Sequence, residues 1–558
     1  MTSRLILDQA VRGADATVQV ERAPDGAVLD ARLDLSILPR LDPLLKGRPA
    51  AEVPPLVERL CGVCPAAHHL AGVAALEALL GGGPLPPRAR WLRRLLHHGS
   101  TLAMRATSFL VEGREEAVAL RRLGKLAQAA AGSPGHFPRT AVVGGVAAWP
   151  VDDAVQAAIE AAPAALAAAQ SLFDWALDAT AAPGLAPGPG TAAAPGAGSG
   201  AGTVPGAGAG LAPGSAAGTG TAAAPRLAPG AGTGAGADAD GIGHGGPRSY
   251  QGADVALVGA DGRLDPLGER LRAVSADGRV LVEGATADLW DQVVAEGRPG
   301  AVASRPYLLA GGPELGAYRV GPVAQLRVAA PATPLAGELR EEWLARAGGA
   351  AAARAVQAVA DVEAILALAG EVLDADEARD AGDALRAGET ASARELGRVG
   401  GMANSGGMAS VGTTGSSGGA VEPGEAGLAP VRSNHLRLET SRDWADVAEG
   451  SVGVGWVDGS RGLLVHRYRV GAGGVVDDAL VLTPTAQNEH WLACLLAWAL
   501  SAEADGPCLE AAVEAAIREA DPCLPCVSAP VGHMGVAVEA VVGGEVSNGV
   551  RGGADQDH

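Results

Sequence analysis

Two Cys-x-x-Cys pairs lie near opposite ends of this 558-residue chain, Cys61 with Cys64 and Cys523 with Cys526. Zinc fingers and ribbons place their two ligand pairs roughly 12–20 residues apart, so a local zinc module is disfavoured. Two remote pairs can still form one tetrathiolate site, and soft thiolates suit nickel, iron or zinc. Such a site requires a fold in which the two ends of the chain meet.

The first pair stands at the expected start of a helix. Pro65 follows Cys64 directly and suits a first helical turn, and apolar residues recur at three- and four-residue intervals over 70–80, which predicts an amphipathic helix. The partial positive charge of a helix N-terminus lowers a thiol pKa and favours the metal-binding thiolate. His68, one turn further on, is expected to donate a hydrogen bond to a metal-bound sulfur.

The composition predicts that part of the chain has nothing large to bury. Glycine (81) and proline (37) are abundant while aromatic residues make up only 3%, and two stretches consist almost entirely of small residues. We interpret these stretches as flexible inserts in one helix-rich body. The predicted segments are 1–178 (first cysteine pair), 179–248 (Ala/Gly/Pro-rich insert), 249–395 (middle of the body), 396–425 (Gly/Ser-rich insert), 426–529 (second cysteine pair) and 530–558 (tail).

Local patterns predict an α+β fold that is rich in helices and has small peripheral sheets. Two strand-like runs, 17–21 and 27–33, flank a Pro- and Gly-containing turn and predict an N-terminal β-hairpin. Further strands are expected at 255–258, 280–283, 463–470 and 479–482, and helices at 87–111, 151–177, 337–373, 488–502 and 509–519.

The charge balance bears on possible partners. Lysine and arginine (43) are outnumbered by aspartate and glutamate (63), and the net charge of −20 disfavours a nucleic-acid or anionic-membrane surface as the main partner. No apolar run approaches the roughly 20 residues of a membrane helix, and the first residues lack the pattern of a signal peptide. We therefore expect no membrane span and a cytoplasmic, reducing location.

The residues around both cysteine pairs resemble the metal signatures of [NiFe]-hydrogenase large subunits. Residues 59–69 (RLCGVCPAAHH) resemble the amino-terminal signature, and residues 518–526 (READPCLPC) resemble the carboxy-terminal one. Segments 318–322, 453–462 and 484–488 are similar to the cytoplasmic, NAD-reducing bidirectional branch, and Gly532 and Met534 fit the propeptide of that branch. The resemblance implies the fold of the hydrogenase large subunit.

The resemblance also implies a cofactor and a reaction. Cys61, Cys64, Cys523 and Cys526 would bind nickel, and Cys64 and Cys526 would bridge to an iron that carries CO and cyanide ligands. The implied reaction is the reversible heterolytic cleavage of H2, in which a nearby base such as a thiolate takes the proton. Arg461 would lie above the open metal positions and position H2, and Asp521 would orient either that arginine or the iron's cyanide.

Three departures from the family pattern affect this expectation. The family's proton-relay glutamate is missing from residues 12–16, where Asp15 is the available substitute. Residues 458–462 keep an acidic residue and Arg461 but lack the family's proline, which loosens the turn. Ala529 stands where the family has a histidine that helps to hold a structural Mg²⁺, and Asp42 aligns with another carboxylate of that magnesium site.

The resemblance implies several partners, and two other functions stay open. Beyond the two pairs only Cys494 and Cys508 remain, so electrons would leave first through an Fe–S small subunit, then through a flavin- and NAD(P)-linked diaphorase module. A maturation protease would remove residues 530–558. The alternatives are a hydrogenase-like paralogue with impaired or lost turnover, which the departures favour, and a zinc or thiol-redox binding protein that uses the same sulfurs.

Overall fold

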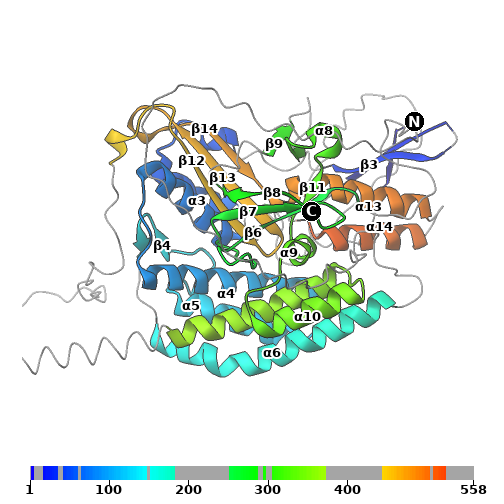
Figure 1. Cartoon of the computed structure of the whole chain (residues 1–558), viewed down its shortest axis with the longest axis horizontal. Coiled ribbons are helices and arrows are strands. Elements are labelled where there is room, and N and C mark those ends of the chain that lie inside the picture. The colour runs from blue at the N-terminus through cyan, green and yellow to red at the C-terminus, as the bar shows by residue number, and fades with distance from the viewer. Residues whose placement is uncertain are drawn as a thin grey trace, which may run out of the picture.

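The computed structural model describes residues 2–5, 17–24, 26–34, 42–60, 64–147, 151–181, 250–286, 293–296, 305–371, 443–502 and 507–522. These residues form the α+β, helix-rich fold with small sheets that the sequence predicts (Figure 1). The insert 396–425, the tail 530–558 and nearly all of the insert 179–248 lie outside the described residues. The segment boundaries therefore stay predictions.

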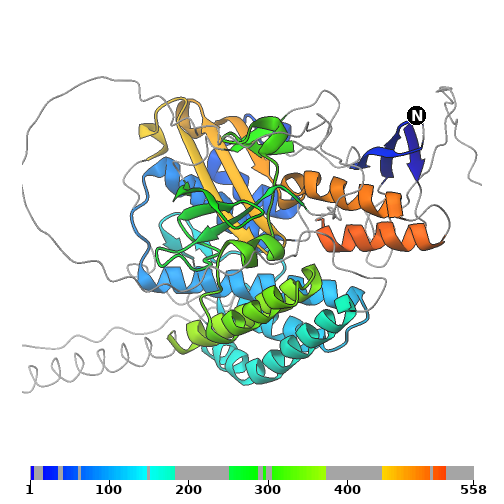
Figure 2. The same cartoon turned by 45° about the vertical axis from the view of Figure 1, so that its right-hand side comes forward.

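The predicted N-terminal hairpin is confirmed and gains a third strand. Strands β2 (Thr17–Arg22) and β3 (Val28–Asp34) pair antiparallel, and β1 (Thr2–Leu5), which the sequence analysis missed, pairs with the other edge of β2. Strand β3 also lies against α13 (Glu489–Ala502), which pairs with α14 (Pro507–Ala520). Figure 2 shows this small sheet, in blue, above the outer ends of α13 and α14.

A three-stranded meander and the helix after Cys64 form the centre of the fold. Strands β12 (Val452–Gly459), β13 (Gly462–Val470) and β14 (Val476–Leu482) are antiparallel, and α3 (Pro65–Leu80) lies along β12. Nearly every residue of α3 is buried, so the prediction of an amphipathic helix was wrong. The reason is that α2, α4 and the meander all pack against α3, so that only Ala74, Glu77 and Ala78 are left outside the buried part of the helix.

Glycines on β12 allow the close approach of α3. A side chain at Gly455 would overlap the Ala71 carbonyl oxygen, and one at Gly453 would overlap the Ala75 carbonyl oxygen. Both obstacles are helix backbone, which cannot rotate away as a side chain can. The strand and the helix are therefore in direct backbone contact.

The substitution Gly455→Ala is expected to destabilise the protein by about 2–4 kcal/mol, because it forces α3 away from β12. Differential scanning calorimetry should show a fall of several degrees in the unfolding temperature. Gly337→Ala is the matched control, since nothing lies within 4 Å of a side chain at Gly337 in α10. It should leave the unfolding temperature unchanged or raise it slightly. Equal effects of the two variants would contradict this account of the packing.

A second sheet packs beside the meander. Its strand order is β11-β6-β7-β8, formed by Tyr318–Arg319, Ala253–Val258, Arg270–Val274 and Val280–Ala285 respectively, and β11 runs parallel to β6. The strands expected at 255–258 and 280–283 are thereby confirmed. Two further hairpins are formed by β4 (Ala141–Val142) with β5 (Gly145–Val146) and by β9 (Val293–Glu296) with β10 (Arg305–Leu308).

Long helices form a layer below the sheets in Figure 1. Helices α4 (Pro87–Val111) and α6 (Asp152–Ala181) confirm two predictions, while α5 (Ala117–Ala130), which packs on both, was missed. The shorter helices are α1 (Asp42–Leu45), η1 (Ala50–Glu52), α2 (Val53–Leu60), α8 (Gly312–Leu315), α9 (Pro322–Val328), η4 (Trp444–Asp446), η5 (Ala472–Gly474) and α12 (Pro484–Gln487).

The single helix expected over 337–373 was wrong, because the chain forms two helices there. Helix α10 (Pro334–Ala345) ends before a short break, and helical residues resume over 350–371. The buried Trp343 side chain explains the break, since its indole Nε1 donates to the Gly349 carbonyl oxygen at 3.1 Å. A side chain at Gly348 would overlap the same indole ring. The tertiary position of one tryptophan therefore interrupts a helical pattern.

Candidate metal centre

Cys64 occupies the N-cap position of α3, as the sequence predicts. Pro65 is the first helical residue, and the Cys64 side chain makes no capping hydrogen bond. The Cys64 residue is partly buried and packs against the main hydrophobic core. The positive end of a well-buried helix therefore lies beside its sulfur, which favours the thiolate that a soft metal requires.

The other predicted cysteine ligands and Asp15 lie outside the described residues. Cys61, Cys523 and Cys526 therefore keep their roles as predictions. Asp42 begins the short helix α1, and its side chain is not described. Within the described residues, no group of three or more histidine, cysteine, aspartate or glutamate residues is arranged to hold a metal ion.

The segments that flank both cysteine pairs approach the same turn, the β12–β13 turn (residues 459–462). On one side, Gly459 lies against Ala67 in the first turn of α3. A Cβ atom added to Gly459 would lie 3.6 Å from the Cβ atom of Ala67. On the other side, Arg461 lies against Asp521, which directly follows α14 and precedes the second cysteine pair. The fold thus brings the N-terminus of α3 and the C-terminus of α14 to one place, as a shared site requires.

Asp521 holds the guanidinium of Arg461. The Arg461 Nε donates to Asp521 Oδ1 at 3.3 Å, and the other carboxylate oxygen accepts from Ser108 at 3.5 Å and lies 3.9 Å from Arg354. Asp521 has a φ of 44°, a left-handed conformation that aspartate tolerates better than most residues. This conformation follows the last residue of α14 and ends the helix. The structure therefore places the two residues in contact, as the prediction for Asp521 requires.

Arg105, a residue that the sequence analysis missed, supports the β12–β13 turn from α4. Its Nη1 donates to the Ser460 carbonyl oxygen at 3.2 Å, and its Nε donates to Asp361 at 2.9 Å. The second oxygen of Asp361 lies 2.9 Å from His98 Nδ1, and all of these side chains are buried. Burial acts to raise the pKa of Asp361, but Arg105 and His98 hold it below the ordinary value, so the carboxylate stays ionised.

The Arg105 contact supports the turn from the α4 side. Gly462 adds to it, because its φ of 122° suits glycine and a side chain there would lie only 2.5 Å from the Gly321 backbone nitrogen. The turn is therefore held by close backbone packing on one side and by a buried arginine on the other. No local signal distinguishes Arg105 from the other arginines of α4, and 355 residues separate it from Ser460.

Asp458 lies just before the turn and lines a cavity of about 340 Å³ between α4, α9 and the helix over 350–371. Its carboxylate accepts hydrogen bonds from the Gln325 side chain at 2.6 Å and from the Leu257 backbone at 3.3 Å. Burial raises the pKa of Asp458 to about 6, although these hydrogen bonds and Arg105 act in the opposite direction. His97 also lines the cavity, and burial lowers its pKa well below the ordinary value.

Asp458 is expected to make protein stability depend on pH between about 4 and 6. The folded-state pKa is about 6 and the unfolded value is about 3.9, so the stabilising proton is fully bound below pH 4. As the pH rises from about 4 to about 6, the free energy of unfolding falls by about 3 kcal/mol, because the unfolded chain releases this proton at a lower pH than the folded protein does. In Asp458→Asn this component disappears, so the unfolding temperature of the variant minus that of the wild type should rise up to pH 6 and then level off. A difference that does not change with pH would contradict the shifted pKa.

His68 lies one turn after Cys64, as predicted, and is buried. Its backbone nitrogen donates to the Cys64 carbonyl oxygen at 3.3 Å, and its ring Nδ1 lies 2.9 Å from His466 Nε2 on β13. Sequence analysis did not identify His466, because alternation along 463–470 predicts only a strand. The ring of His68 is therefore held by a residue of the central sheet.

Comparison with known proteins gives a local match in sequence and a nearly complete match in fold. A sequence model described as nickel-dependent hydrogenase matches residues 40–109, which include the first cysteine pair. One component of the F420-non-reducing hydrogenase vhu of Methanococcus voltae is 31% identical over 157 residues, covering 23% of this chain and 37% of that protein. The beta subunit of the NAD-reducing hydrogenase HoxS of Cupriavidus necator is 30% identical over 115 residues, covering 20% of this chain and 24% of that protein. The alignments thus span well under half of the length of these curated relatives.

The similar solved structures cover nearly the whole chain. A crystal structure of an NAD⁺-reducing [NiFe]-hydrogenase in the H2-reduced state matches 94% of this chain and 99% of its own, with a TM-score of 0.65 and 22% identity. The structure of a [NiFeSe] hydrogenase variant from Desulfovibrio vulgaris Hildenborough matches 94% of this chain and 99% of its own, with a TM-score of 0.55 and 14% identity. At these identities the matches establish a common fold. Among the described residues, no helix has the length and apolarity needed to cross a membrane.

Proposed function

From its sequence similarity to nickel-dependent hydrogenases and its fold, which is that of a hydrogenase large subunit, we propose that this chain is the catalytic large subunit of a [NiFe]-hydrogenase. The observation that carries the proposal is the convergence at the β12–β13 turn. Cys64 begins α3 on one side of this turn, and Asp521 leads into the second cysteine pair on the other. The proposed reaction is the reversible heterolytic cleavage of H2.

The proposed cofactor fits the one thiol that the structure describes at the site. Cys64 combines a helix N-terminus with a mainly apolar environment, a setting that favours a soft, thiolate-bound metal. Together with Cys61, Cys523 and Cys526 it would hold a nickel–iron centre with CO and cyanide on iron. This centre would supply the electron-pair acceptor at which the H–H bond is split. Asp42 would contribute to a Mg²⁺ site that is weakened by Ala529.

The residues of the chain would then orient the reaction and remove the proton. Arg461 is always protonated, and its planar guanidinium would present fixed donors to the reacting molecule. Asp521 would restrain its rotation through the Nε contact, and Arg105 would limit the movement of the backbone that carries it. The Cys526 thiolate would accept the proton first, and Asp15 is the proposed next acceptor in place of the missing glutamate.

The proposed partners follow from the chemistry that the chain lacks. The two remaining cysteines, Cys494 and Cys508, cannot hold an Fe–S cluster, so an Fe–S small subunit would carry the electrons away. Similarity to the NAD-reducing HoxS hydrogenase supports a flavin- and NAD(P)-linked diaphorase as the next carrier. A maturation protease would remove residues 530–558, and the cytoplasm is the proposed compartment because thiols stay reduced there.

A second candidate is a hydrogenase-like paralogue with impaired or lost turnover. The specific observations in its favour are Asp15, which is shorter than the family's glutamate and displaced from it, and Ala529 at the position of the family's histidine. Such a protein would acquire the metal centre and assemble with its partners, but proton transfer would be slow. The two candidates therefore differ in turnover and not in metal content.

The deciding experiment is production of the chain with its maturation factors and its small subunit. Nickel, iron and zinc per chain would be measured by mass spectrometry, CO and cyanide by infrared spectroscopy, and turnover by H2/D⁺ exchange. Nickel, iron, both infrared signals and exchange support the hydrogenase. The same metals without exchange support the paralogue. Zinc alone overturns both and leaves a zinc or thiol-redox binding protein.

A further inference from the structure

The last turn of α14 meets the first turn of the helix over 350–371. The Glu519 carboxylate accepts the Ala350 backbone N–H, with its two oxygens 3.0 and 3.2 Å from that nitrogen. In the opposite direction, Arg354 Nη1 donates to the Arg518 carbonyl oxygen at 3.3 Å. Each helix therefore caps the end of the other, and we call this pair of contacts the α14 clasp.

Both contacts of the clasp satisfy backbone groups that a helix leaves without partners. The first N–H groups of a helix carry a partial positive charge, and the last carbonyl groups carry a partial negative charge. A carboxylate is therefore stabilising at the start of a helix, and a guanidinium is stabilising at its end. The α14 clasp has the favourable charge at both positions.

Arg354 is buried and lies close to three carboxylates. Its Nη1 is 3.9 Å from Asp521 Oδ2, and its Nη2 is 3.8 Å from Glu112 Oε1. Burial raises the pKa of Glu519, whereas Arg354 and the Ala350 N–H act in the opposite direction. The charge of Arg354 thus favours the ionised form of Glu519, which is the form that the clasp requires.

The helix over 350–371 is fixed in the main hydrophobic core. Its fully buried side chains in that core include Val356, Val359, Val362 and Ile365. The start of the helix is also held from another direction, because the Trp343 indole donates to the Gly349 carbonyl oxygen. The clasp therefore ties the end of α14 to an element that is itself well packed.

The end of α14 determines where Asp521 lies. Asp521 follows α14 directly, two residues after Glu519, and its Oδ1 accepts from Arg461 Nε at 3.3 Å. A shift at the end of α14 would move this carboxylate and the guanidinium that it contacts. Building on the proposed function, we propose that Glu519 is a positioning residue, whose clasp contact holds the end of α14 so that Asp521 keeps Arg461 aimed at the metal centre.

The first test reads the clasp directly and does not require a metal. Hydrogen–deuterium exchange of the full chain would be followed by mass spectrometry in the wild type and in Glu519→Ala. Amides at the end of α14, which include the Asp521 N–H bonded to the Ile517 carbonyl oxygen, should exchange about ten-fold faster in the variant. Glu519→Gln keeps an oxygen that can accept the Ala350 N–H, so it should recover most of the protection. Unchanged exchange there in Glu519→Ala would overturn the proposal.

The matched control is Glu363→Ala, which removes a cap of the same kind elsewhere. The Glu363 carboxylate accepts from the backbone N–H groups of Leu335 and Ala336 at the start of α10, both at 3.0 Å. Its removal should speed exchange at the start of α10 and leave the end of α14 unchanged. Faster exchange at the end of α14 in both variants would mean that general destabilisation, and not the clasp, controls this segment.

The second test uses the enzyme assembled with its small subunit and reads turnover. In Glu519→Ala, H2/D⁺ exchange should fall about ten-fold while the nickel and iron contents stay the same, because small misplacements of an orienting group are costly. Glu519→Gln should restore most of the turnover, and Glu363→Ala should stay within about two-fold of the wild type. Equal losses in Glu519→Ala and Glu363→Ala would show a merely structural role and overturn the proposal.

A double substitution tests whether Glu519 acts through Asp521. Asp521→Asn suits the same left-handed backbone and removes the charge that contacts Arg461. In this background Glu519→Ala should lower turnover by less than about two-fold more. Losses that multiply independently would overturn the link to Arg461. If the wild type carries no nickel–iron centre, the proposed function fails, but the first test still decides whether Glu519 holds the end of α14.

Discussion

Cys64→Ser is expected to leave less than about a tenth of the nickel per chain and to lower H2/D⁺ exchange by roughly 10³-fold or more. Cys64 is the proposed ligand that both metals share, and it is held at the N-cap of α3. A serine hydroxyl is a hard donor that stays protonated near neutral pH, so neither the charge nor the softness of the thiolate is replaced. Metal analysis and exchange would be measured on the variant assembled with its small subunit.

The control for this variant is Cys494→Ser. Cys494 lies in α13 and is also partly buried, but it belongs to neither cysteine pair. Its replacement should preserve metal content and exchange, and unfolding temperatures would show that both variants fold. Normal nickel and iron in Cys64→Ser would exclude Cys64 as the shared ligand, and the site would have to be assigned to other residues.

Arg461→Lys is expected to keep the metal centre and to lower the turnover number by about 10²–10³-fold. Lysine retains the positive charge but lacks the planar fork of donors, and it cannot reproduce the Nε contact with Asp521 while pointing in the same direction. Infrared spectroscopy would establish that the centre is present, and H2 oxidation at saturating substrate would give the turnover number.

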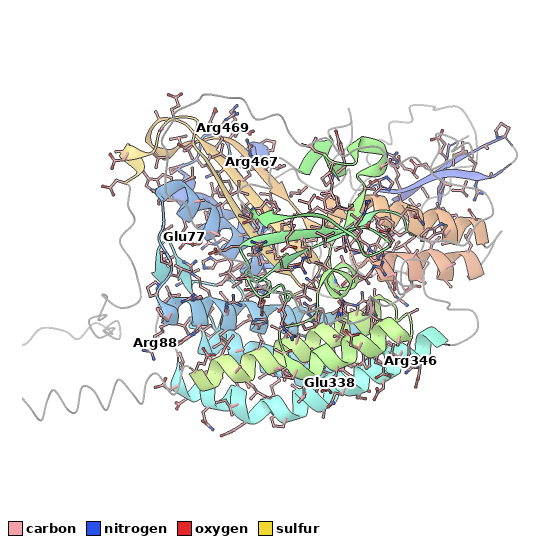
Figure 3. The ribbon with its side chains drawn as sticks, in the orientation of Figure 1. Glu77, Arg88, Glu338, Arg346, Arg467 and Arg469 are labelled. Carbon is pink, nitrogen blue, oxygen red and sulfur yellow. The ribbon has the colours of Figure 1, made fainter. Side chains whose placement is uncertain are left out.

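The matched control is Arg469→Lys on the same strand system. Figure 3 shows Arg469 near the outer end of the sheet, close to the labelled Arg467. The side chain of Arg469 is 42% exposed and pairs with Asp477, which is also exposed, so little energy depends on its geometry. It should leave turnover unchanged. Turnover of Arg461→Lys within about two-fold of the wild type would remove Arg461 from the proposed mechanism.

The local structure around the site was largely predictable from sequence. Pro65 after Cys64 correctly placed the start of α3, and the apolar spacing over 70–80 correctly predicted a helix. The same spacing wrongly predicted an amphipathic helix, because α3 is buried along nearly its whole length. The environment of a helix depends on what packs against it, and local periodicity carries no information about β12 or α4.

The missed site residues share one property, which is that their partners are distant in sequence. Arg105 reads as one more arginine of α4 until the fold brings it to Ser460, 355 residues away. His466 reads as a residue of an ordinary strand until β13 packs against α3 and brings it to His68, 398 residues away. The raised pKa of Asp458 likewise arises from its burial, which the sequence around it does not encode.

The sequence by itself determined the chemistry that is available and the local elements that carry it. It supplied four cysteines in two remote pairs, a helix start at Cys64, and an arginine in a turn just before the strand expected at 463–470. Only the tertiary structure decided that Asp521 contacts Arg461, that Arg105 contacts Ser460, and that His466 contacts His68. The physical reason is that periodicity and capping act within a few residues, whereas hydrogen bonds between remote side chains form only after the helices and sheets have packed.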